Sequence, residues 1–148
     1  MRPVAFTFSG SVAVPMDRVF ALISDPTRMA EWLPGCRSVT PTPAPQRKGK
    51  GDRHRIEYDR DGQRSEAEIE IIDYKPPDTY GWVEISGRAQ EKTLFALAFQ
   101  GGATKVTMRD VWVPANWRAW LLGQLLRRRS AARTFNRLLQ NLRKILTR

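Results

Sequence analysis

The sequence predicts an α+β fold in which one antiparallel sheet of about seven strands precedes a long C-terminal helix. Apolar and polar residues alternate with a period of two through much of residues 4–113, which is typical of strands with one buried face. After Pro114 the apolar residues recur instead with the period of a helix. Because most of the strands are joined by short turns, we expect them to pair antiparallel.

The composition predicts one folded domain covering residues 1–148. Hydrophobic residues make up 41% of the chain and charged residues 27%, which argues against disorder. Cys36 is the single cysteine, which excludes an intrachain disulfide and a zinc site built on paired thiolates. No apolar run reaches the roughly 18 residues that a membrane-spanning helix needs. We therefore expect a cytoplasmic protein, with peripheral contact to a membrane left open.

One strand and two short helices are expected before residue 36. Residues 4–14 alternate between apolar and polar side chains and end at a proline. The next stretch, "MDRVFALISD", concentrates its apolar residues on one helical face. In "DPTRMAEWLPG", Asp25 is a suitable N-cap, Pro26 takes the first helical position, and a Pro-Gly pair ends the turn.

The middle of the chain is expected to form six more strands. "RDGQ" carries the Asp-Gly pair that favours a tight hairpin, and Gly101-Gly102 marks a second turn. "TPTPAPQRKGKG", residues 40–51, is interpreted as a mobile loop between strands. The expected strands are 36–40, 52–59, 66–72, 79–86, 92–100 and 104–113.

The C-terminal segment carries most of the net charge of +10. Nine of the 25 basic residues follow Asp110, whereas none of the 15 acids does. From Ser130 onward the leucines share one face, so the arginines there should face solvent. A straight helix extended backwards would bury Arg128 and expose Leu122 and Leu126. We therefore predict a break between Arg127 and Ser130, with Ser130 capping a second helix.

Several stretches together resemble the START-like superfamily (SRPBCC), in particular its polyketide cyclase/dehydrase and lipid-transport branch. They are "VAVPMDRVFALISDPTRMAEWLPG", "GGATKV" and the terminal "LLQNLRKIL". Members typically open with a strand ending in proline, a helix with Val-Phe, an Asp-Pro step and a Trp-x-Pro-Gly turn. The resemblance implies a helix-grip fold, in which a curved sheet grips the long C-terminal helix and encloses an apolar cavity.

The resemblance also implies that part of the inward-facing surface binds a hydrophobic small molecule. The alternative for most of these positions, taken singly, is a packed core. The candidate ligand-binding residues are His54, Ile56, Tyr58, Ile69, Ile71, Phe95, Leu97, Phe99, Met108, Asp110, Trp112, Phe135, Leu139 and Leu142.

Three polar residues on that face are the best candidates for specificity. His54 could transfer protons near neutral pH, or it could be a histidine satisfied by one hydrogen bond at a strand end. Asp110 lies between apolar neighbours, so its pKa could be raised for acid–base work, or the carboxylate could pair with an arginine such as Arg128. Tyr58 is the third candidate. No metal-ligand cluster or nucleophile–base pair is visible, and no cofactor is expected.

The stretch around the predicted break has two interpretations. Arg127, Arg128 and Arg129 could bind a phosphate, a carboxylate or an anionic lipid headgroup, with Trp117 and Trp120 at a membrane interface. Alternatively, the arginines form a solvated turn and the tryptophans cover the mouth of the cavity. Nucleic acid is not expected as a partner, because the aromatic residues fall on buried faces.

Three functions remain open from the sequence. The favoured one is a carrier of a hydrophobic small molecule such as a lipid, an isoprenoid quinone or a polyketide-like compound. The second is a cyclase, aromatase or dehydratase that uses the same cavity, with Asp110, His54 or Tyr58 moving protons. The third is an adaptor that binds a membrane or ribosomal surface through its basic end. The oligomeric state is not predicted.

Overall fold

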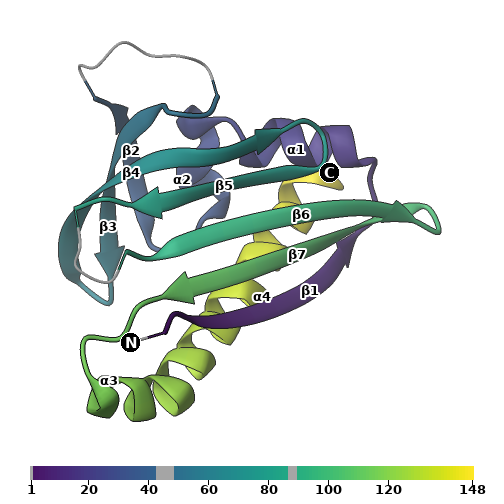
Figure 1. Cartoon of the computed structure of the whole chain (residues 1–148). Helices are drawn as coiled ribbons and strands as arrows, with labels where there is room; N and C mark the ends of the chain where they lie inside the picture. Colours follow the sequence, from purple (N-terminus) through teal and green to yellow (C-terminus); the bar gives the residue numbers. More distant parts are fainter. Residues whose placement is uncertain (1, 43–48, 87–89) are drawn as a thin grey trace.

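Seven antiparallel strands form one sheet in the computed structural model, which describes residues 2–42, 49–86 and 90–148 (Figure 1). The order across the sheet is β1-β7-β6-β5-β4-β3-β2, so β1 and β2 are its two edges. This confirms the predicted antiparallel sheet. The strands are β1 (Val4–Val12), β2 (Cys36–Pro41), β3 (Arg53–Arg60), β4 (Gln63–Lys75), β5 (Thr79–Glu84), β6 (Lys92–Gln100) and β7 (Ala103–Trp112).

The two predicted glycine turns join neighbouring strands. Asp61 and Gly62 adopt φ values of 54° and 82° and connect β3 to β4. Gly101 and Gly102, with φ of 60° and 80°, connect β6 to β7 in the same way. Positive φ at both central positions matches the right-handed twist of the strands, which is why these residue pairs form tight hairpins.

Three short helical elements follow β1 and lie on the same side of the sheet as the terminal helix (Figure 1). They are α1 (Met16–Ile23), the 3₁₀ turn η1 (Pro26–Arg28) and α2 (Met29–Trp32). The Asp25 side chain accepts a hydrogen bond from the backbone N–H of Thr27 at 3.0 Å, so the predicted N-cap is present. Residues 43–48 of the loop predicted at 40–51 lie outside the described residues.

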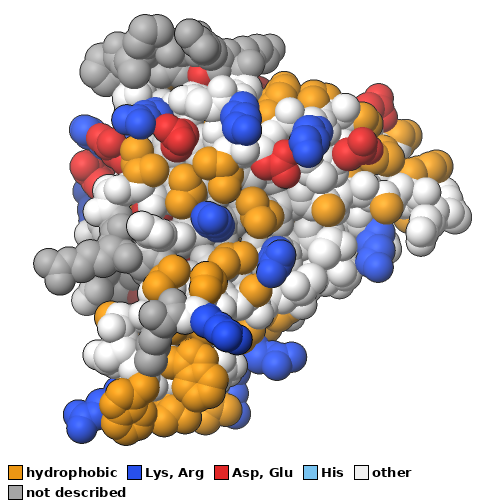
Figure 2. All heavy atoms as spheres, viewed as in Figure 1, with side chains coloured by type: hydrophobic (Ala, Val, Ile, Leu, Met, Phe, Trp, Pro, Cys, Tyr) orange, Lys and Arg blue, Asp and Glu red, His pale blue; other side chains and the backbone are white. Residues whose placement is uncertain are grey.

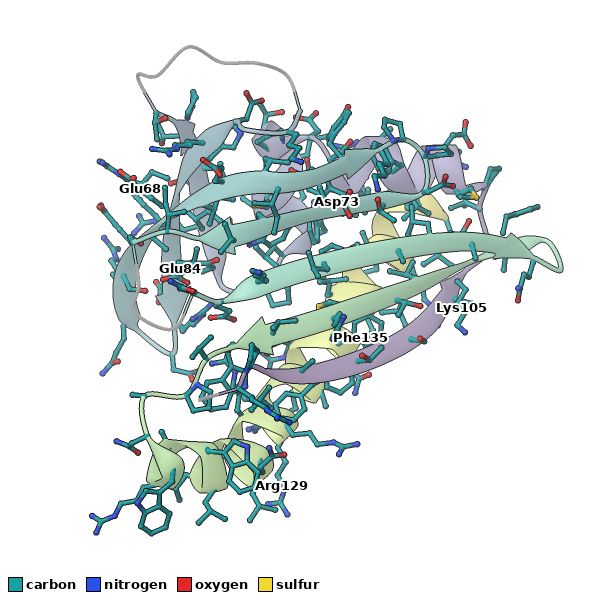
Figure 3. The ribbon with its side chains drawn as sticks, in the orientation of Figure 1. Glu68, Asp73, Glu84, Lys105, Arg129 and Phe135 are labelled. Carbon is teal, nitrogen blue, oxygen red and sulfur yellow. The ribbon has the colours of Figure 1, made fainter. Side chains whose placement is uncertain are left out.

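The long C-terminal helix, α4 (Arg128–Leu146), crosses the concave face of the sheet (Figure 1). Its apolar stripe packs as predicted, and Phe135 stacks on Phe8 of β1 with ring centroids 5.9 Å apart (Figure 3). Phe99 departs from the prediction, because its side chain is 50% exposed. Phe99 lies next to the β6–β7 turn, where the hairpin extends past the helices. The buried residues of α4 are Phe135, Leu138, Leu139, Leu142 and Leu146.

The predicted break between Arg127 and Ser130 is wrong. α3 (Trp117–Leu122) continues through a π-helical turn, η2 (Gly123–Arg127), directly into α4, and Ser130 lies inside α4 rather than at its cap. A π turn inserts extra backbone into a helix, and the faces on either side of it are rotated relative to each other. Arg128 therefore reaches solvent without any interruption of the helical path.

Candidate ligand-binding pockets

Two pockets lie on the concave side of the sheet, and a cluster of aromatic rings separates them. Tyr80 lines the first pocket and Trp82 lines the second, and the centroids of these two rings are 6.0 Å apart. Trp32 of α2 packs against Trp82 and Phe95 at 6.4 and 5.8 Å. The rings thus fill the middle of the space between sheet and helices. Among the described residues, these two pockets therefore do not form the one continuous cavity that was predicted.

The pocket beside the first turns of α4, here named the α4 pocket, has a volume of about 470 Å³. This volume lies within the range of small-molecule sites. Its apolar walls come from the segment that follows α2 and from β3, β5 and β7, and its polar groups come from β3, the β3–β4 turn, Glu91, β6, β7, η2 and α4. It is lined by Leu33, Pro34, Gly35, Tyr58, Asp59, Arg60, Asp61, Trp82, Glu91, Thr93, Met108, Asp110, Arg127, Ser130, Ala131, Arg133, Thr134 and Arg137.

Asp110 and Arg127 form the most buried charged contact of the α4 pocket. Arg127 Nη2 donates to Asp110 Oδ1 at 3.4 Å and lies 3.0 Å from Glu91 Oε1. The guanidinium also covers the ring of Trp112, 4.6 Å from its centroid. The predicted ion pair of Asp110 is therefore present, but its partner is Arg127 rather than Arg128. Arg128 points to solvent because the π turn rotates it away from the sheet.

Burial is the main cause that raises the pKa of Asp110 to about 6. The Arg127 guanidinium lowers this pKa and the neighbouring Glu91 carboxylate raises it, so burial and Glu91 together outweigh the ion pair. Tyr58, in the same pocket, is also buried, and burial raises the pKa of its phenol. The Arg60 guanidinium lies over the Tyr58 ring, 4.1 Å from the centroid. Tyr58 is thus a neutral hydrogen-bonding group near pH 7.

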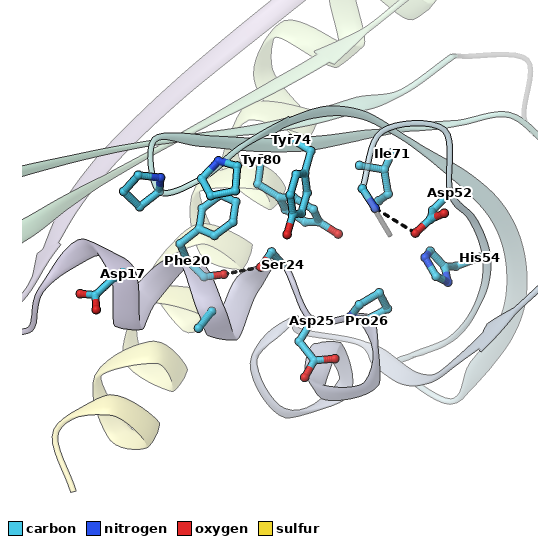
Figure 4. Close-up of a pocket in the computed structure, with 14 residues that line it drawn as sticks. Asp17, Phe20, Ser24, Asp25, Pro26, Asp52, His54, Ile71, Tyr74 and Tyr80 are labelled. Carbon is cyan, nitrogen blue, oxygen red and sulfur yellow. Dashed lines mark hydrogen bonds between the residues drawn. The ribbon is translucent and has the colours of Figure 1, made fainter. Parts of the chain in front are cut away.

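The pocket lined by Tyr80, here named the α1 pocket, lies between α1 and strands β3 to β5 and also measures about 470 Å³ (Figure 4). Figure 4 shows Tyr74 and Tyr80 over α1 and the Asp52 and His54 side chains together at one side. The carboxylates in its lining are those of Asp17, Asp25 and Asp52, and no Lys or Arg is among the lining residues. The lining residues are Asp17, Phe20, Ala21, Ser24, Asp25, Pro26, Gly49, Asp52, His54, Ile71, Tyr74, Pro76, Pro77 and Tyr80.

His54 is buried in the α1 pocket, and neither ring nitrogen has a hydrogen-bond partner among the described residues. The single hydrogen bond expected for His54 is therefore not found among the described residues. Burial lowers the pKa of His54, and the Asp52 carboxylate acts in the opposite direction. Asp52 accepts one hydrogen bond from the backbone N–H of Gly49 at 3.1 Å. His54 is thus a neutral polar group that faces the pocket.

The structure distributes the predicted ligand-binding residues among both pockets and the core. His54 and Ile71 line the α1 pocket, whereas Tyr58, Met108 and Asp110 line the α4 pocket. His54 and Asp110 are therefore not brought to one site. The others, apart from the exposed Phe99, are buried and line neither pocket: Ile56, Ile69, Phe95, Leu97, Trp112, Phe135, Leu139 and Leu142.

Some pocket residues were not predicted from the sequence. Asp52 was not named as a candidate, although it begins the expected strand 52–59 and alternation places it on the same face as His54. Arg127 was assigned to a solvated or anion-binding joint, yet it turns inward. For Tyr80 and Trp82 a signal existed, because both fall on one face of the expected strand 79–86. Within the described ranges, no three His, Cys, Asp or Glu residues are grouped to hold a metal ion.

The three arginines at the joint differ in their exposure to solvent. Arg127 is turned to the sheet, while Arg128 and Arg129 are exposed, and Arg129 projects from the end of the molecule where α3 lies (Figure 3). Trp117 and Trp120 are also exposed. The prediction that the aromatic residues fall on buried faces is therefore wrong for Trp117 and Trp120. In the part of the chain described, no helix is long and apolar enough to span a membrane.

A family model described as polyketide cyclase / dehydrase and lipid transport matches residues 3–147. Comparison with curated protein sequences found no match. Among solved structures, a START superfamily protein from Mycobacterium smegmatis is 14% identical, with 95% of this chain and 94% of that chain covered and a TM-score of 0.75. Ginseng major latex-like protein 151 from Panax ginseng is 12% identical, with 96% of each chain covered and a TM-score of 0.75. Protein MLL2253 from Mesorhizobium loti is 15% identical, with 97% of each chain covered and a TM-score of 0.73. These structural likenesses establish the START-like, helix-grip fold.

Proposed function

Because the chain belongs to the polyketide cyclase / dehydrase and lipid transport family, we propose that it carries a hydrophobic small molecule in its α4 pocket. Family membership indicates binding of a hydrophobic ligand in general terms. The choice of the α4 pocket and of a ligand class is our proposal and does not follow from family membership. We consider a lipid, a quinone or a polyketide-like compound.

The observation that carries the proposal is the apolar floor of the α4 pocket. Trp82, Met108 and Leu33 are buried side chains that nevertheless line this open space. A pocket with an apolar floor and a few polar groups is typical of small-molecule sites. Tyr58 adds a phenol to this floor, so a ligand oxygen could be bound there.

The rim of the α4 pocket favours a ligand with an acidic group. Arg133 and Arg137 lie one helical turn apart on α4 and both line the pocket. Among the ion pairs between described residues, none involves either arginine. Two adjacent guanidiniums suit a carboxylate or sulfonate at the end of an apolar body.

Two fluorescent probes of nearly equal shape test this proposal. 1-Anilinonaphthalene-8-sulfonate carries a sulfonate, whereas N-phenyl-1-naphthylamine lacks it. We expect the sulfonate probe to bind more tightly, and Arg133→Gln/Arg137→Gln to weaken it about tenfold while leaving the neutral probe unaffected. Equal loss for both probes would contradict the role of the arginines.

Filling one pocket at a time identifies the site. Thr134→Trp introduces a ring into the α4 pocket from α4, and Ala21→Trp is the matched change in the α1 pocket from α1. We expect Thr134→Trp to abolish probe fluorescence enhancement and Ala21→Trp to preserve it. The reverse result would move the binding site to the α1 pocket and overturn the proposal. Native mass spectrometry of protein purified from its own host then identifies the bound compound.

An enzyme acting on such a ligand is the second candidate. The observation in its favour is that Asp110, whose pKa is raised to about 6 by burial, lines the same pocket as Tyr58. A dehydratase or aromatase would release water from the bound compound on prolonged incubation, whereas a cyclase acting without dehydration would convert it to an isomer of equal mass and different chromatographic retention. Asp110→Asn would stop either conversion. A carrier would return the compound unchanged in mass and retention with both proteins.

A further inference from the structure

The segment formed by α3 and η2 has its large apolar side chains on the outside. Six of them are between 42% and 69% exposed, whereas a helix on a protein surface normally turns such residues to the core. We name this surface the α3 apolar surface. It consists of Trp117, Trp120, Leu121, Leu122, Leu125 and Leu126.

The opposite side of the same segment faces the protein and holds small or polar residues. Ala119, Gly123, Gln124 and Arg127 are the half-buried positions. A Cβ atom on Gly123 would lie 2.3 Å from the Trp112 ring, so the helix approaches this ring as closely as only glycine permits. Together with the Arg127 contacts to Asp110 and Glu91, this approach fixes the rotation of the segment and directs its leucines outward.

Positive charges flank the α3 apolar surface. Figure 2 shows hydrophobic side chains gathered at the end of the molecule where α3 lies, with basic side chains beside them. Arg118, Arg128 and Arg129 are exposed, and the Arg118 guanidinium lies 5.5 Å from the Trp117 ring centroid. No Asp or Glu follows Asp110 in the sequence, so this end of the chain carries only positive charge.

We propose that the α3 apolar surface binds an anionic lipid bilayer at its interface, with the two tryptophans and four leucines entering the lipid and the arginines contacting headgroups. Exposed apolar patches of this kind mark sites of association. An apolar helical face with tryptophan and flanking arginines is the pattern of helices that lie in the membrane interface. This proposal does not depend on the pocket proposed above.

Charge favours a lipid surface over a second copy of the chain. A symmetric dimer through the α3 apolar surface would bring Arg118, Arg128 and Arg129 of both copies together, and the helical segment itself has no acidic side chain to balance them. Anionic headgroups neutralise the same arginines. The four exposed leucines also distinguish the surface from a nucleic-acid site, because leucine offers no ring on which a base can stack.

Sedimentation with vesicles tests the proposal on the full chain. We expect binding to phosphatidylcholine vesicles containing phosphatidylglycerol, and weak or no binding to phosphatidylcholine alone. Leu122→Gln/Leu125→Gln/Leu126→Gln should lower the partition coefficient into these anionic vesicles by about tenfold or more. The matched control is Phe99→Gln, which removes an exposed apolar side chain from the β6–β7 hairpin and should leave binding unchanged.

The charge requirement has its own matched pair of variants. Arg118→Gln/Arg128→Gln/Arg129→Gln should weaken binding on the order of a hundredfold at low salt. Lys92→Gln/Lys105→Gln/Arg109→Gln removes the same charge from exposed positions of β6 and β7 and should have a much smaller effect. Equal losses for both triple variants would show nonspecific attraction and overturn the proposed surface.

Tryptophan fluorescence reports which part of the chain enters the lipid. Trp32, Trp82 and Trp112 are at most 7% exposed, so brominated acyl chains should quench only Trp117 and Trp120. We expect quenching in anionic vesicles, and its loss in Trp117→Phe/Trp120→Phe despite continued sedimentation. Failure to bind anionic vesicles at low salt would overturn the proposal. So would a leucine-dependent dimer or leucine-dependent RNA binding in place of vesicle binding.

Discussion

The two parts of the terminal helical segment use the same residue types in opposite ways. α4 buries Leu138 and Leu142 completely against the sheet, whereas Leu125 and Leu126 of η2 are 69% and 63% exposed. Both parts are rich in leucine and arginine. The difference arises at the π turn, because the helix rotates there and α3 extends past the edge of the sheet (Figure 1). Composition alone therefore does not tell which leucines form a core.

The largest expected effect contrasts one leucine from each part. Leu142→Ala should lower the free energy of unfolding by about 2–5 kcal/mol, because it leaves a cavity in the core. Leu125→Ala, the matched change in η2, should alter it by no more than about 0.5 kcal/mol. Urea denaturation of both variants measures this. Similar losses for the two would mean that Leu125 is buried in solution.

An intermediate effect contrasts neighbouring arginines on either side of the boundary between η2 and α4. Arg127→Met should destabilise the protein by about 1–3 kcal/mol at pH 7, because it leaves the buried Asp110 carboxylate without its donor. Arg128→Met removes the same charge from an exposed side chain and should change stability by less than about 0.5 kcal/mol. Thermal unfolding monitored by circular dichroism compares the stabilities of the two variants with that of the wild type. The opposite order would restore Arg128 as the partner of Asp110.

A smaller effect concerns the pH dependence of the contact between β7 and η2. The pKa of Asp110 is about 6 in the folded protein, whereas the ordinary value for an aspartate is 3.8. Between these two pH values the folded state therefore binds more protons than the unfolded state. This group's contribution to the free energy of unfolding therefore decreases as pH rises from about 4 to 6.

The Asp110→Asn variant should lack this pH-dependent contribution to the free energy of unfolding. The free energy of unfolding of the wild type relative to the variant should be greatest near pH 4 and should fall toward pH 7. His54 and Glu84 titrate in both proteins, so their contributions cancel in this difference. Urea midpoints measured at several pH values give the difference. A difference that is constant with pH would show that Asp110 titrates at its ordinary value.

The sheet and the helix stripe could be predicted from the sequence because they follow from local periodicity. Alternation placed Val106, Met108, Asp110 and Trp112 on one face of β7, and all four are buried. The turn residues Asp61-Gly62 and Gly101-Gly102 were equally informative, because their backbone conformation restricts the residue type.

The site was less predictable because it depends on contacts between distant segments. His54 and Asp110 have the same period-two signature, yet the aromatic rings of Trp82, Trp32 and Tyr80 separate their pockets. The π turn left no distinctive residue pattern either. Its effect on Arg127 and Arg128 is visible only once Trp112 is placed against Gly123.

The strand order has a consequence for self-association in the crowded cell. An open sheet has two edges, each of which could template the addition of a strand from another molecule. At the β1 edge, Arg143 Nε donates to the Ser11 carbonyl at 3.0 Å, so one edge acceptor is already used. At the other edge, β2 spans six residues and ends at Pro41, which has no backbone N–H to offer. Each edge thus offers at least one fewer backbone group for pairing with an added strand.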